Sequence, residues 1–282
     1  MKLVLELLKA VLFGIVEGIT EWLPISSTGH LILLDELVKL DVTKEFYSMF
    51  QVVIQLGAIL AVILLFFHKL NPFSPKKDAK QKKRTWELWA KVIVAVVPSG
   101  VAGVLLNDWM DAHLYNAWVV ALTLILYGVA FLYVERRNQG HAPRIKNVNE
   151  IDYRTAIYIG LFQCLSLVPG TSRSGATILG AILLGVSRSA AAEFSFFLAI
   201  PTMVGASGLK LLKYLKSGMI PSGQEIGVLI VGCLVSFLVS VVVIRSLMQF
   251  VRKRSFSVFG VYRIVLGILV VLFFAIRGLV AA

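Results

Sequence analysis

The sequence predicts an all-α polytopic membrane protein built as an inverted-topology repeat, and three observations lead to this prediction. Hydrophobic residues make up 58% of the 282 residues and charged residues only 16%, far from the balance of a soluble domain. Several apolar runs are long enough to cross a hydrocarbon core of about 30 Å, for which a helix needs roughly 20 residues. Finally, segments of the first half of the chain recur in the second half.

Charge and cysteine usage exclude other classes of protein. The formal net charge of +12 comes from basic residues in short loops between apolar runs, which indicates membrane topology and no nucleic-acid partner. Cys164 and Cys233 lie in apolar stretches and are expected to be small core residues without a disulfide. The N-terminal run contains Glu6 and Glu17 and no small-residue cleavage site, so we expect it to be retained.

Six apolar runs are predicted to be transmembrane helices in contact with membrane lipids. They lie at residues 46–67, 89–106, 117–134, 190–209, 225–245 and 256–276. The alternation of period two that marks the strands of a membrane barrel is missing from the sequence. Helices must therefore satisfy the backbone polar groups inside the lipid.

Two further apolar stretches, residues 3–40 and 154–188, are predicted to be re-entrant hairpins of two short helices. The residues that interrupt them are Pro24 and Gly29 in the first stretch and Pro169, Gly170 and Gly175 in the second. Non-helical backbone at membrane depth is tolerated only where protein or a water-filled cavity surrounds it. Both interruptions, here called the first and second breaks, should therefore line a cavity.

The loops predict the topology. Residues 68–84 contain seven Lys and Arg, residues 135–154 contain five, and "VRKR" (251–254) adds a third basic connection. These loops should lie in the cytoplasm. Residues 107–116 contain neither Lys nor Arg and should lie outside, together with both termini. The connection after residue 209 carries three lysines and is placed outside only by alternation.

The internal repeat follows from comparing the sequence with itself. A shift of 146 residues places residues 14–33 over 160–179, and a shift of 148 places 45–58 over 193–206. The matched pairs include Gly14 with Gly160, Glu17 with Gln163, Ser26 with Ser172, Thr28 with Ser174, and Gly29 with Gly175. We predict two repeats, residues 1–140 and 141–282, each with one hairpin and three spans. Because three is odd, the halves lie in opposite orientations, and the broken helices should meet near the membrane midplane.

The first break carries carboxylates, hydroxyls and an imidazole. Glu17 and Glu21 are spaced i,i+4, which places them on one face of a helix. In an apolar site two such carboxylates need a divalent cation, a cationic partner or a shared proton. Ser26 and Ser27 could simply cap the following helix. His30 lies within one helical turn of either serine.

The second break, "PGTSRSGAT" (169–177), is typical of an anion site. A glycine-rich turn around Gly170 that opens a helix presents free backbone N–H groups and the positive end of the helix dipole. Arg173 adds a cation whose planar fork matches phosphate oxygens. The hydroxyl donors here are Ser172, Ser174 and Thr177. The alternative is a structural ion pair between Arg173 and Glu17 or Glu21.

Together the two breaks predict a phosphoryl-transfer site, and here the sequence resembles a known family. Such a site needs clamps on the phosphoryl oxygens, a nucleophile, and a group that carries a proton. Over nearly its whole length the chain resembles the bacitracin-resistance (BacA/UppP) family of undecaprenyl-diphosphate phosphatases. The motifs that carry the resemblance are "EGITE" (17–21), "SSTGH" (26–30), "PGTSRSGAT" (169–177) and "SRSAAAEFSFFLAIP" (187–201).

The resemblance implies a phosphatase of the bacterial cytoplasmic membrane that recycles the lipid carrier of peptidoglycan synthesis. Its substrate would be the polyprenyl lipid undecaprenyl diphosphate, its cofactor a divalent cation, and its active site would face the outer side. The functional set implied by the motifs is Glu17, Glu21, Ser27, His30, Arg173, Ser174 and Thr177. A homodimer is left open.

We hypothesise the following roles. Arg173 and the 170–175 backbone hold the diphosphate, with Ser26 and the hydroxyls of the second break as further phosphate ligands. Glu17 and Glu21 bind Mg²⁺ or Ca²⁺ through oxygen. Ser27 attacks the terminal phosphorus, with His30 handling its proton. Attack by water activated by His30 is the alternative mechanism.

A different class of function is also compatible with an inverted repeat. Broken helices at the midplane are common in secondary transporters, and a transporter or flippase of an anionic lipid could use an arginine with hydroxyls. Transport does not require a nucleophile, a base and paired carboxylates. The residues of the first break therefore favour the enzyme.

Overall fold

The computed structural model describes residues 2–281, and at residues 107, 111 and 277–281 it describes the backbone only. Within these residues the chain is almost entirely helical. The α-helices are α1 (Lys2–Thr20), α2 (Ser27–Leu37), α3 (Lys44–Val53), α4 (Gln55–Leu65), α5 (Phe67–Leu70), α6 (Ala79–His113), α7 (Ala117–Arg137), α8 (Tyr153–Cys164), α9 (Arg173–Leu183), α10 (Arg188–Lys216), α11 (Gly223–Lys253) and α12 (Ser257–Ala281). Two short 3₁₀ helices are η1 (Val148–Glu150) and η2 (Leu165–Leu167).

Six helical segments of the described chain are long and apolar enough to span a membrane, and each coincides with one of the predicted runs. The prediction of an all-α polytopic membrane protein is confirmed. The first of these segments, Lys44–Leu65, is interrupted at Ile54, between α3 and α4.

Helix α6 is longer than predicted and corrects two loop assignments. Its N-terminus lies inside the basic segment 68–84, because Asp78 and Gln81 form a capping box there. Its C-terminal end covers most of residues 107–116, so the assignment of that segment to a loop was wrong. Asn116 already caps α7 by accepting a hydrogen bond from the Val119 N–H, which leaves only a short connection.

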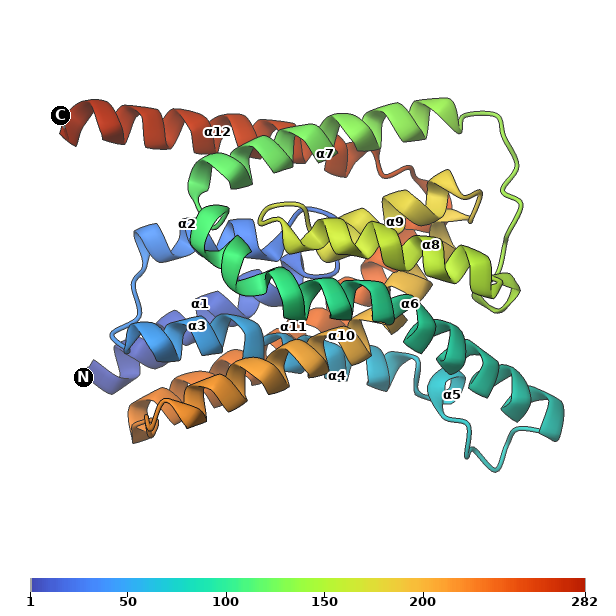
Figure 1. Ribbon diagram of the computed structural model, residues 1–282, viewed down its shortest axis with the longest axis horizontal. Helices are drawn as coiled ribbons and strands as arrows, with labels where there is room; N and C mark the ends of the chain where they lie inside the picture. Colours follow the sequence, from blue (N-terminus) through green and yellow to red (C-terminus); the bar gives the residue numbers. More distant parts are fainter. Residues whose placement is uncertain (1, 282) are drawn as a thin grey trace.

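The two interrupted stretches form hairpins, α1 with α2 and α8 with α9. They enter from opposite ends of the molecule, and their turns lie near its middle (Figure 1). The first helix of each hairpin packs along a long helix of the other half, α1 along α11 and α8 along α6. Glycines permit both contacts: Gly14 lies against the backbone of Gly232, and Gly160 against the backbone of Ala95.

Gly160→Ala is expected to lower the melting temperature of the protein in detergent. A Cβ at Gly160 would lie 2.0 Å from the Ala95 carbonyl oxygen, so the two helix backbones must separate, at a cost of roughly 1–3 kcal/mol. Gly100→Ala on α6 is the matched control, because a Cβ there meets nothing within 4 Å. Equal melting temperatures for the two variants would contradict the prediction.

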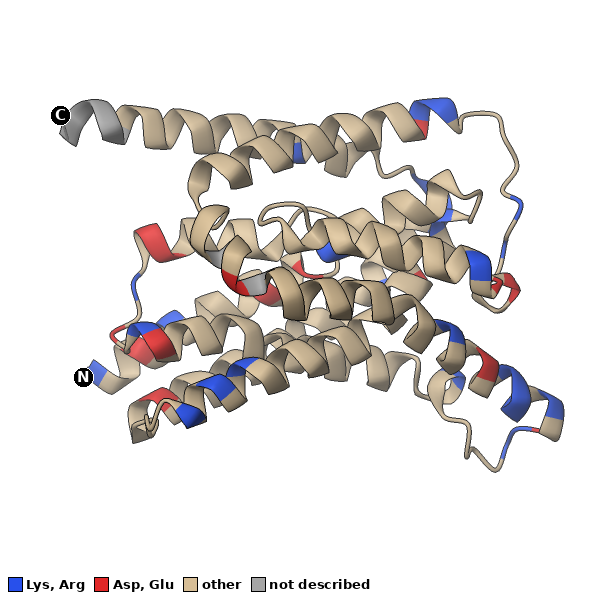
Figure 2. Ribbon diagram, in the orientation of Figure 1, with Lys and Arg blue, Asp and Glu red and all other residues tan. Residues whose placement is uncertain are grey.

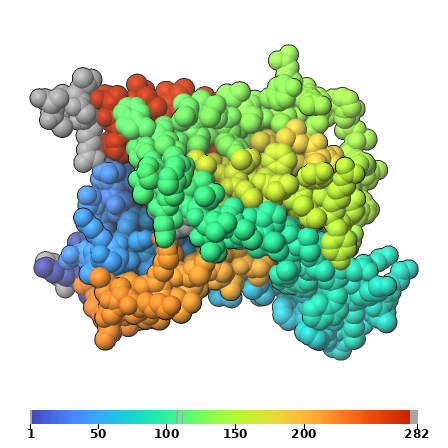
Figure 3. Space-filling model, viewed as in Figure 1, coloured from blue at the N-terminus to red at the C-terminus, as the bar shows by residue number. Residues whose placement is uncertain are grey.

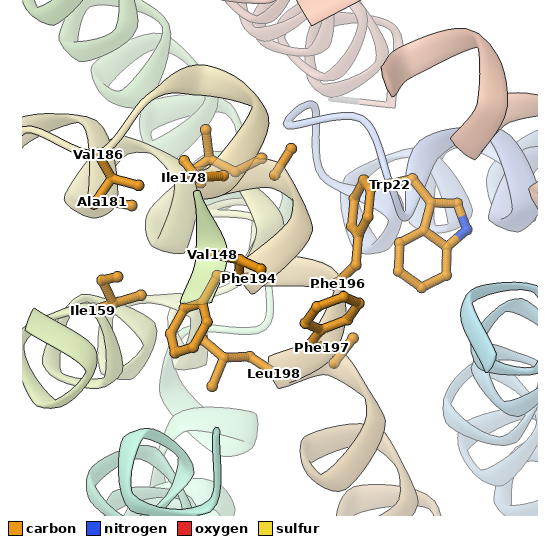
Figure 4. Packing of buried hydrophobic residues seen from close by; sticks show 14 of the residues in the cluster. Trp22, Val148, Ile159, Ile178, Ala181, Val186, Phe194, Phe196, Phe197 and Leu198 are labelled. Carbon is orange, nitrogen blue, oxygen red and sulfur yellow. The ribbon is translucent and has the colours of Figure 1, made fainter. Parts of the chain in front are cut away.

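Aromatic packing fixes the end of α1 next to the first break. Trp22, directly after Glu21, is fully buried and meets Phe196 of α10 edge to face, with ring centroids 5.2 Å apart (Figure 4). Phe194 and Phe197 of α10 extend the same cluster toward α9 and α8. From the side drawn in Figure 3, helices α6, α7, α8 and α10 form much of the surface, beside parts of the blue N-terminal helices and of the red α12.

Basic residues gather at one end of the molecule. Figure 2 shows Lys and Arg concentrated on the right, where the connections α5–α6, α7–α8 and α11–α12 lie. Further lysines lie at the opposite end, on the last turns of α10. The described ends of the chain, Lys2 and Ala281, lie at that opposite end as well (Figure 1). Residues 1 and 282, the termini predicted to face outward, lie outside the described residues.

Candidate active site

The two breaks share one local conformation. Ser26 and Ser172 are the non-glycine residues of the described chain with positive φ, 73° and 71°. Each caps the helix that follows, and its hydroxyl accepts a hydrogen bond from the N–H of Gly29 (3.3 Å) or Gly175 (3.1 Å). Both serines were predicted as phosphate ligands. Capping, the alternative that the sequence had left open at Ser26, is present at both positions. It uses each hydroxyl only as an acceptor, so the role of the two serines as phosphate ligands stays a prediction.

Glu21 joins the two breaks. The Arg173 Nη2 atom lies 3.3 Å from Glu21 Oε1, and its Nη1 atom donates to the Ser195 carbonyl oxygen at 2.7 Å. The Ser174 hydroxyl donates to the Glu21 carbonyl oxygen at 3.0 Å. The ion pair considered as an alternative for Arg173 is therefore present, and it lies inside the predicted site.

Ser27 lies next to the same carboxylate. Its hydroxyl donates to Glu21 Oε2 at 2.6 Å, and its side chain is buried. The Glu21 carboxylate thus binds the predicted nucleophile, Ser27, with one oxygen and the predicted phosphate ligand, Arg173, with the other. This arrangement can hold the serine hydroxyl toward a phosphoryl group bound by the arginine.

His30 has other partners than Ser27. Its Nδ1 atom lies 2.7 Å from the Ser26 carbonyl oxygen, and its Nε2 atom lies 2.7 Å from the Tyr262 hydroxyl. The two rings are stacked, with centroids 5.8 Å apart. Because a carbonyl can only accept, Nδ1 carries the hydrogen, and in the neutral ring Nε2 is a free base that accepts from Tyr262. His30, predicted to handle the proton of Ser27, is therefore not hydrogen-bonded to it, and the Ser27 hydroxyl donates to Glu21.

Two charged groups of the site have unsatisfied atoms. Glu17 is fully buried, and neither of its carboxylate oxygens has a hydrogen-bond partner among the described residues. The same holds for the Nε–H of Arg173. Unpaired buried charge is expensive, so the carboxylate suits a cation and the guanidinium suits an anion. A phosphorylated ligand with a divalent cation would satisfy both.

The donor set for a cation consists of Glu17 and Glu21. The described residues hold no group of three or more His, Cys, Asp or Glu that could form a complete metal site. Mg²⁺ is commonly held by one or two carboxylates, with water and substrate phosphate as the remaining ligands. Two carboxylates, one of them with both oxygens free, fit that type of site.

Thr177 and Gly170 support the second break from inside. The Thr177 hydroxyl hydrogen-bonds to the Arg173 carbonyl oxygen at 2.9 Å and to the Ser195 hydroxyl at 2.7 Å. Gly170 has φ of 85°, and a Cβ there would lie 2.2 Å from Thr123 Oγ1 of α7. Both residues therefore hold the turn in place, and their roles as phosphate ligands, through the Thr177 hydroxyl and the Gly170 backbone, stay predictions.

Arg263 of α12 was missed by the sequence analysis. It is fully buried, and it donates to the carbonyl oxygens of Pro24 (3.0 Å), Gly170 (2.8 Å) and Thr171 (3.0 Å). It therefore ties the first break to the second and to α12. The available signal was a lone arginine inside a predicted span, since an ionisable residue at membrane depth indicates a function.

Comparison with known proteins finds relatives that cover nearly the whole chain. The family model described as "Bacitracin resistance protein BacA" matches residues 10–269. The "Undecaprenyl-diphosphatase" of Limosilactobacillus fermentum is 59% identical over 272 residues, which cover 96% of this chain and 99% of that protein. The protein of the same name from Enterococcus faecalis is 56% identical, with 94% of this chain and 96% of that protein covered.

Proposed function

The chain belongs to the BacA family of bacitracin resistance proteins, and on this premise we propose that it is a membrane phosphatase that converts undecaprenyl diphosphate to undecaprenyl phosphate and inorganic phosphate. The observation that carries the proposal is the hydrogen-bonded group of Ser27, Glu21 and Arg173, where the two breaks meet. It combines a nucleophile, a proton acceptor and a phosphate clamp. The reaction would serve the recycling of the cell-wall lipid carrier.

Phosphate release from a polyprenyl diphosphate tests this function. Purified full-length protein in detergent should release inorganic phosphate and leave the polyprenyl monophosphate. A preparation of wild-type protein that binds the lipid diphosphate without hydrolysing it would favour a transporter instead.

The proposed reaction has two steps. Ser27 Oγ forms a bond to the terminal phosphorus, the bond from that phosphorus to the bridging oxygen breaks, and polyprenyl phosphate leaves. The serine proton passes to Glu21, whose Oε2 already accepts it as a hydrogen bond. Arg173 stabilises the phosphoryl oxygens. Water then attacks the phosphoserine, and we assign its proton to the unprotonated Nε2 of His30, which passes it on to solvent. The bond between Ser27 Oγ and phosphorus breaks, Oγ takes back the proton from Glu21, and inorganic phosphate leaves.

We propose that a divalent cation, Mg²⁺ or Ca²⁺, is held by Glu17 and Glu21. The bound cation would neutralise charge on the diphosphate. Support comes from the buried Glu17 carboxylate, whose oxygens accept no hydrogen bond from the described residues.

Glu17→Gln is expected to weaken the dependence of activity on divalent cation as well as the rate. A neutral amide oxygen binds a hard cation less tightly than a carboxylate, so the variant should need more cation for half-maximal phosphate release. Glu6→Gln on the same helix is the control, because Glu6 pairs with Lys9 away from the breaks. Wild-type activity that is indifferent to chelator would contradict the cation.

We also propose that the halves 1–140 and 141–282 form an inverted repeat in the bacterial cytoplasmic membrane, with the active site open to the outer side. Several features support the repeat. The two breaks share their conformation at equivalent serines, the hairpins enter from opposite ends (Figure 1), and α1 with α11 mirrors α8 with α6. The basic connections indicate which end faces the cytoplasm.

Cysteine labelling of intact cells tests the orientation. In a protein without Cys164 and Cys233, an impermeant thiol reagent should label Met110→Cys, because the far end of α6 is proposed to lie outside. Lys80→Cys at the other end of α6 should react only after the cells are permeabilised. Labelling of Lys80→Cys but not Met110→Cys would invert the topology.

A further inference from the structure

A second basic cavity lies away from the candidate active site. It has a volume of about 540 Å³ and lies where the connection between α7 and α8 meets the start of α10 and the end of α11. Its lining includes Arg137, Arg144, Arg188 and Arg252. Helix α9, 11 residues and about 16 Å long, separates it from Arg173. The proposed phosphatase reaction uses none of its residues.

The charge of this cavity is only partly balanced. Arg188 forms a two-pronged ion pair with the buried carboxylate of Glu135. Arg144 interacts with Asp152. Arg137 and Arg252 have no ion pair within the described residues. Arginines from three chain segments, 137–144, 182–189 and 251–252, therefore line one hollow with less negative than positive charge.

Hydrogen bonds hold the walls of the cavity in place. The connection between α7 and α8 is paired with the turn after α9: the Ile145 N–H donates to the Gly185 carbonyl oxygen, and the Ser187 N–H donates to the Ile145 carbonyl oxygen. Gly185 adopts φ of 81°, which favours glycine. Glu135 also accepts from the Phe256 N–H at 2.9 Å, which anchors the start of α12. The backbone around the hollow is thus held in place, while Arg137, Arg144 and Arg252 of its lining are exposed to solvent.

We propose that this cavity binds a phosphate group, as a second anion site at the end of the molecule that we assign to the cytoplasm. Guanidinium forks match phosphate oxygens. The first turn of α10 also faces the hollow, with Ser187, Arg188 and Ser189 in its lining, and the free N–H groups of a helix start favour an anion. The phosphate could belong to the headgroup of an anionic lipid or to free inorganic phosphate, since the chemistry is the same.

Two binding measurements on full-length protein separate these sources. In neutral detergent, inorganic phosphate is titrated by calorimetry. In nanodiscs of phosphatidylcholine with or without phosphatidylglycerol, native mass spectrometry counts the anionic lipids retained by the protein. Phosphate binding in detergent that is weakened by the cavity substitutions described next identifies the free anion, and retention of phosphatidylglycerol alone identifies the headgroup. If neither probe binds, the proposal is wrong.

The variant that locates the binding is Arg137→Gln with Arg252→Gln, which leaves the ion pair of Arg188 intact. Loss of two charge-assisted contacts should weaken binding about tenfold or more. Lys80→Gln with Lys83→Gln removes the same charge from the start of α6 and should change binding by less than about twofold. Size-exclusion profiles and melting temperatures without ligand verify folding.

Two results would overturn the proposal at this stage. Equal loss of affinity in both double variants would mean that the net charge of the protein, and not this cavity, determines binding. Unchanged affinity in the cavity variant would mean that Arg137 and Arg252 bind no anion. They would then only stabilise the C-termini of their helices, where a positive charge is favourable without a ligand. The inference does not depend on the proposed phosphatase activity, because both readouts measure binding in the absence of substrate.

Discussion

Ser27→Ala is expected to lower turnover of polyprenyl diphosphate by roughly three orders of magnitude or more, as for loss of a nucleophile in other covalent mechanisms. The hydroxyl that donates to Glu21 at 2.6 Å would be lost, and with it the oxygen that forms the phosphoserine. Phosphate release at saturating substrate measures the effect. Ser246→Ala is the control, because this exposed serine bonds only to its own helix.

The stereochemistry at phosphorus decides the mechanism independently of the variant. Two displacements through a phosphoserine retain configuration, whereas direct attack by water inverts it. A single turnover with a chiral terminal phosphate and labelled water separates the two, and inversion would exclude a covalent Ser27 intermediate. In that case His30→Ala should be inactive while Ser27→Ala keeps substantial activity.

Arg173→Lys is expected to lower kcat/KM by about a hundredfold, although it keeps the positive charge. The guanidinium reaches the Ser195 carbonyl oxygen and Glu21 with its two Nη atoms and keeps Nε free. A compact ammonium cannot reproduce these directions together with a grip on phosphate. Steady-state kinetics of the variant measure the loss.

Arg154→Lys is the matched control for this substitution, since Arg154 is exposed on α8 and lies over the ring of Tyr158. It should keep kcat/KM near that of the unsubstituted protein. If Arg173→Lys does the same, Arg173 would serve only as the counter-ion of Glu21.

The predictable part of this protein is what periodicity and composition determine locally. Long apolar runs become long helices, because lipid leaves the backbone no other partners. Pro24 and Gly170 indicate the breaks because proline lacks a backbone N–H donor and glycine readily adopts the positive φ of a turn. The convergence of the breaks could also be predicted, and Glu21 and Arg173 do meet. The end of α6 was misjudged because polar residues alone do not stop a helix.

The partners of side chains in the site could not be predicted from spacing. His30 lies one helical turn from Ser27 along α2, yet its ring pairs with Tyr262, 232 residues away in the chain. Arg263 holds three carbonyl groups that no sequence pattern marks as acceptors. Such contacts depend on how α12 packs, and that information lies in the tertiary structure.

The positive φ of Ser26 and Ser172 has a consequence for how the enzyme divides its energetics between folding and catalysis. A side chain in this region stores backbone strain of order 1–3 kcal/mol, and the dense contacts around Trp22 and Arg263 keep it from relaxing. The free energy of this strain therefore lowers the stability of the fold and does not recur in each catalytic cycle. Each substrate then finds turns that need no backbone rearrangement, so less of its binding energy is diverted to shaping the site.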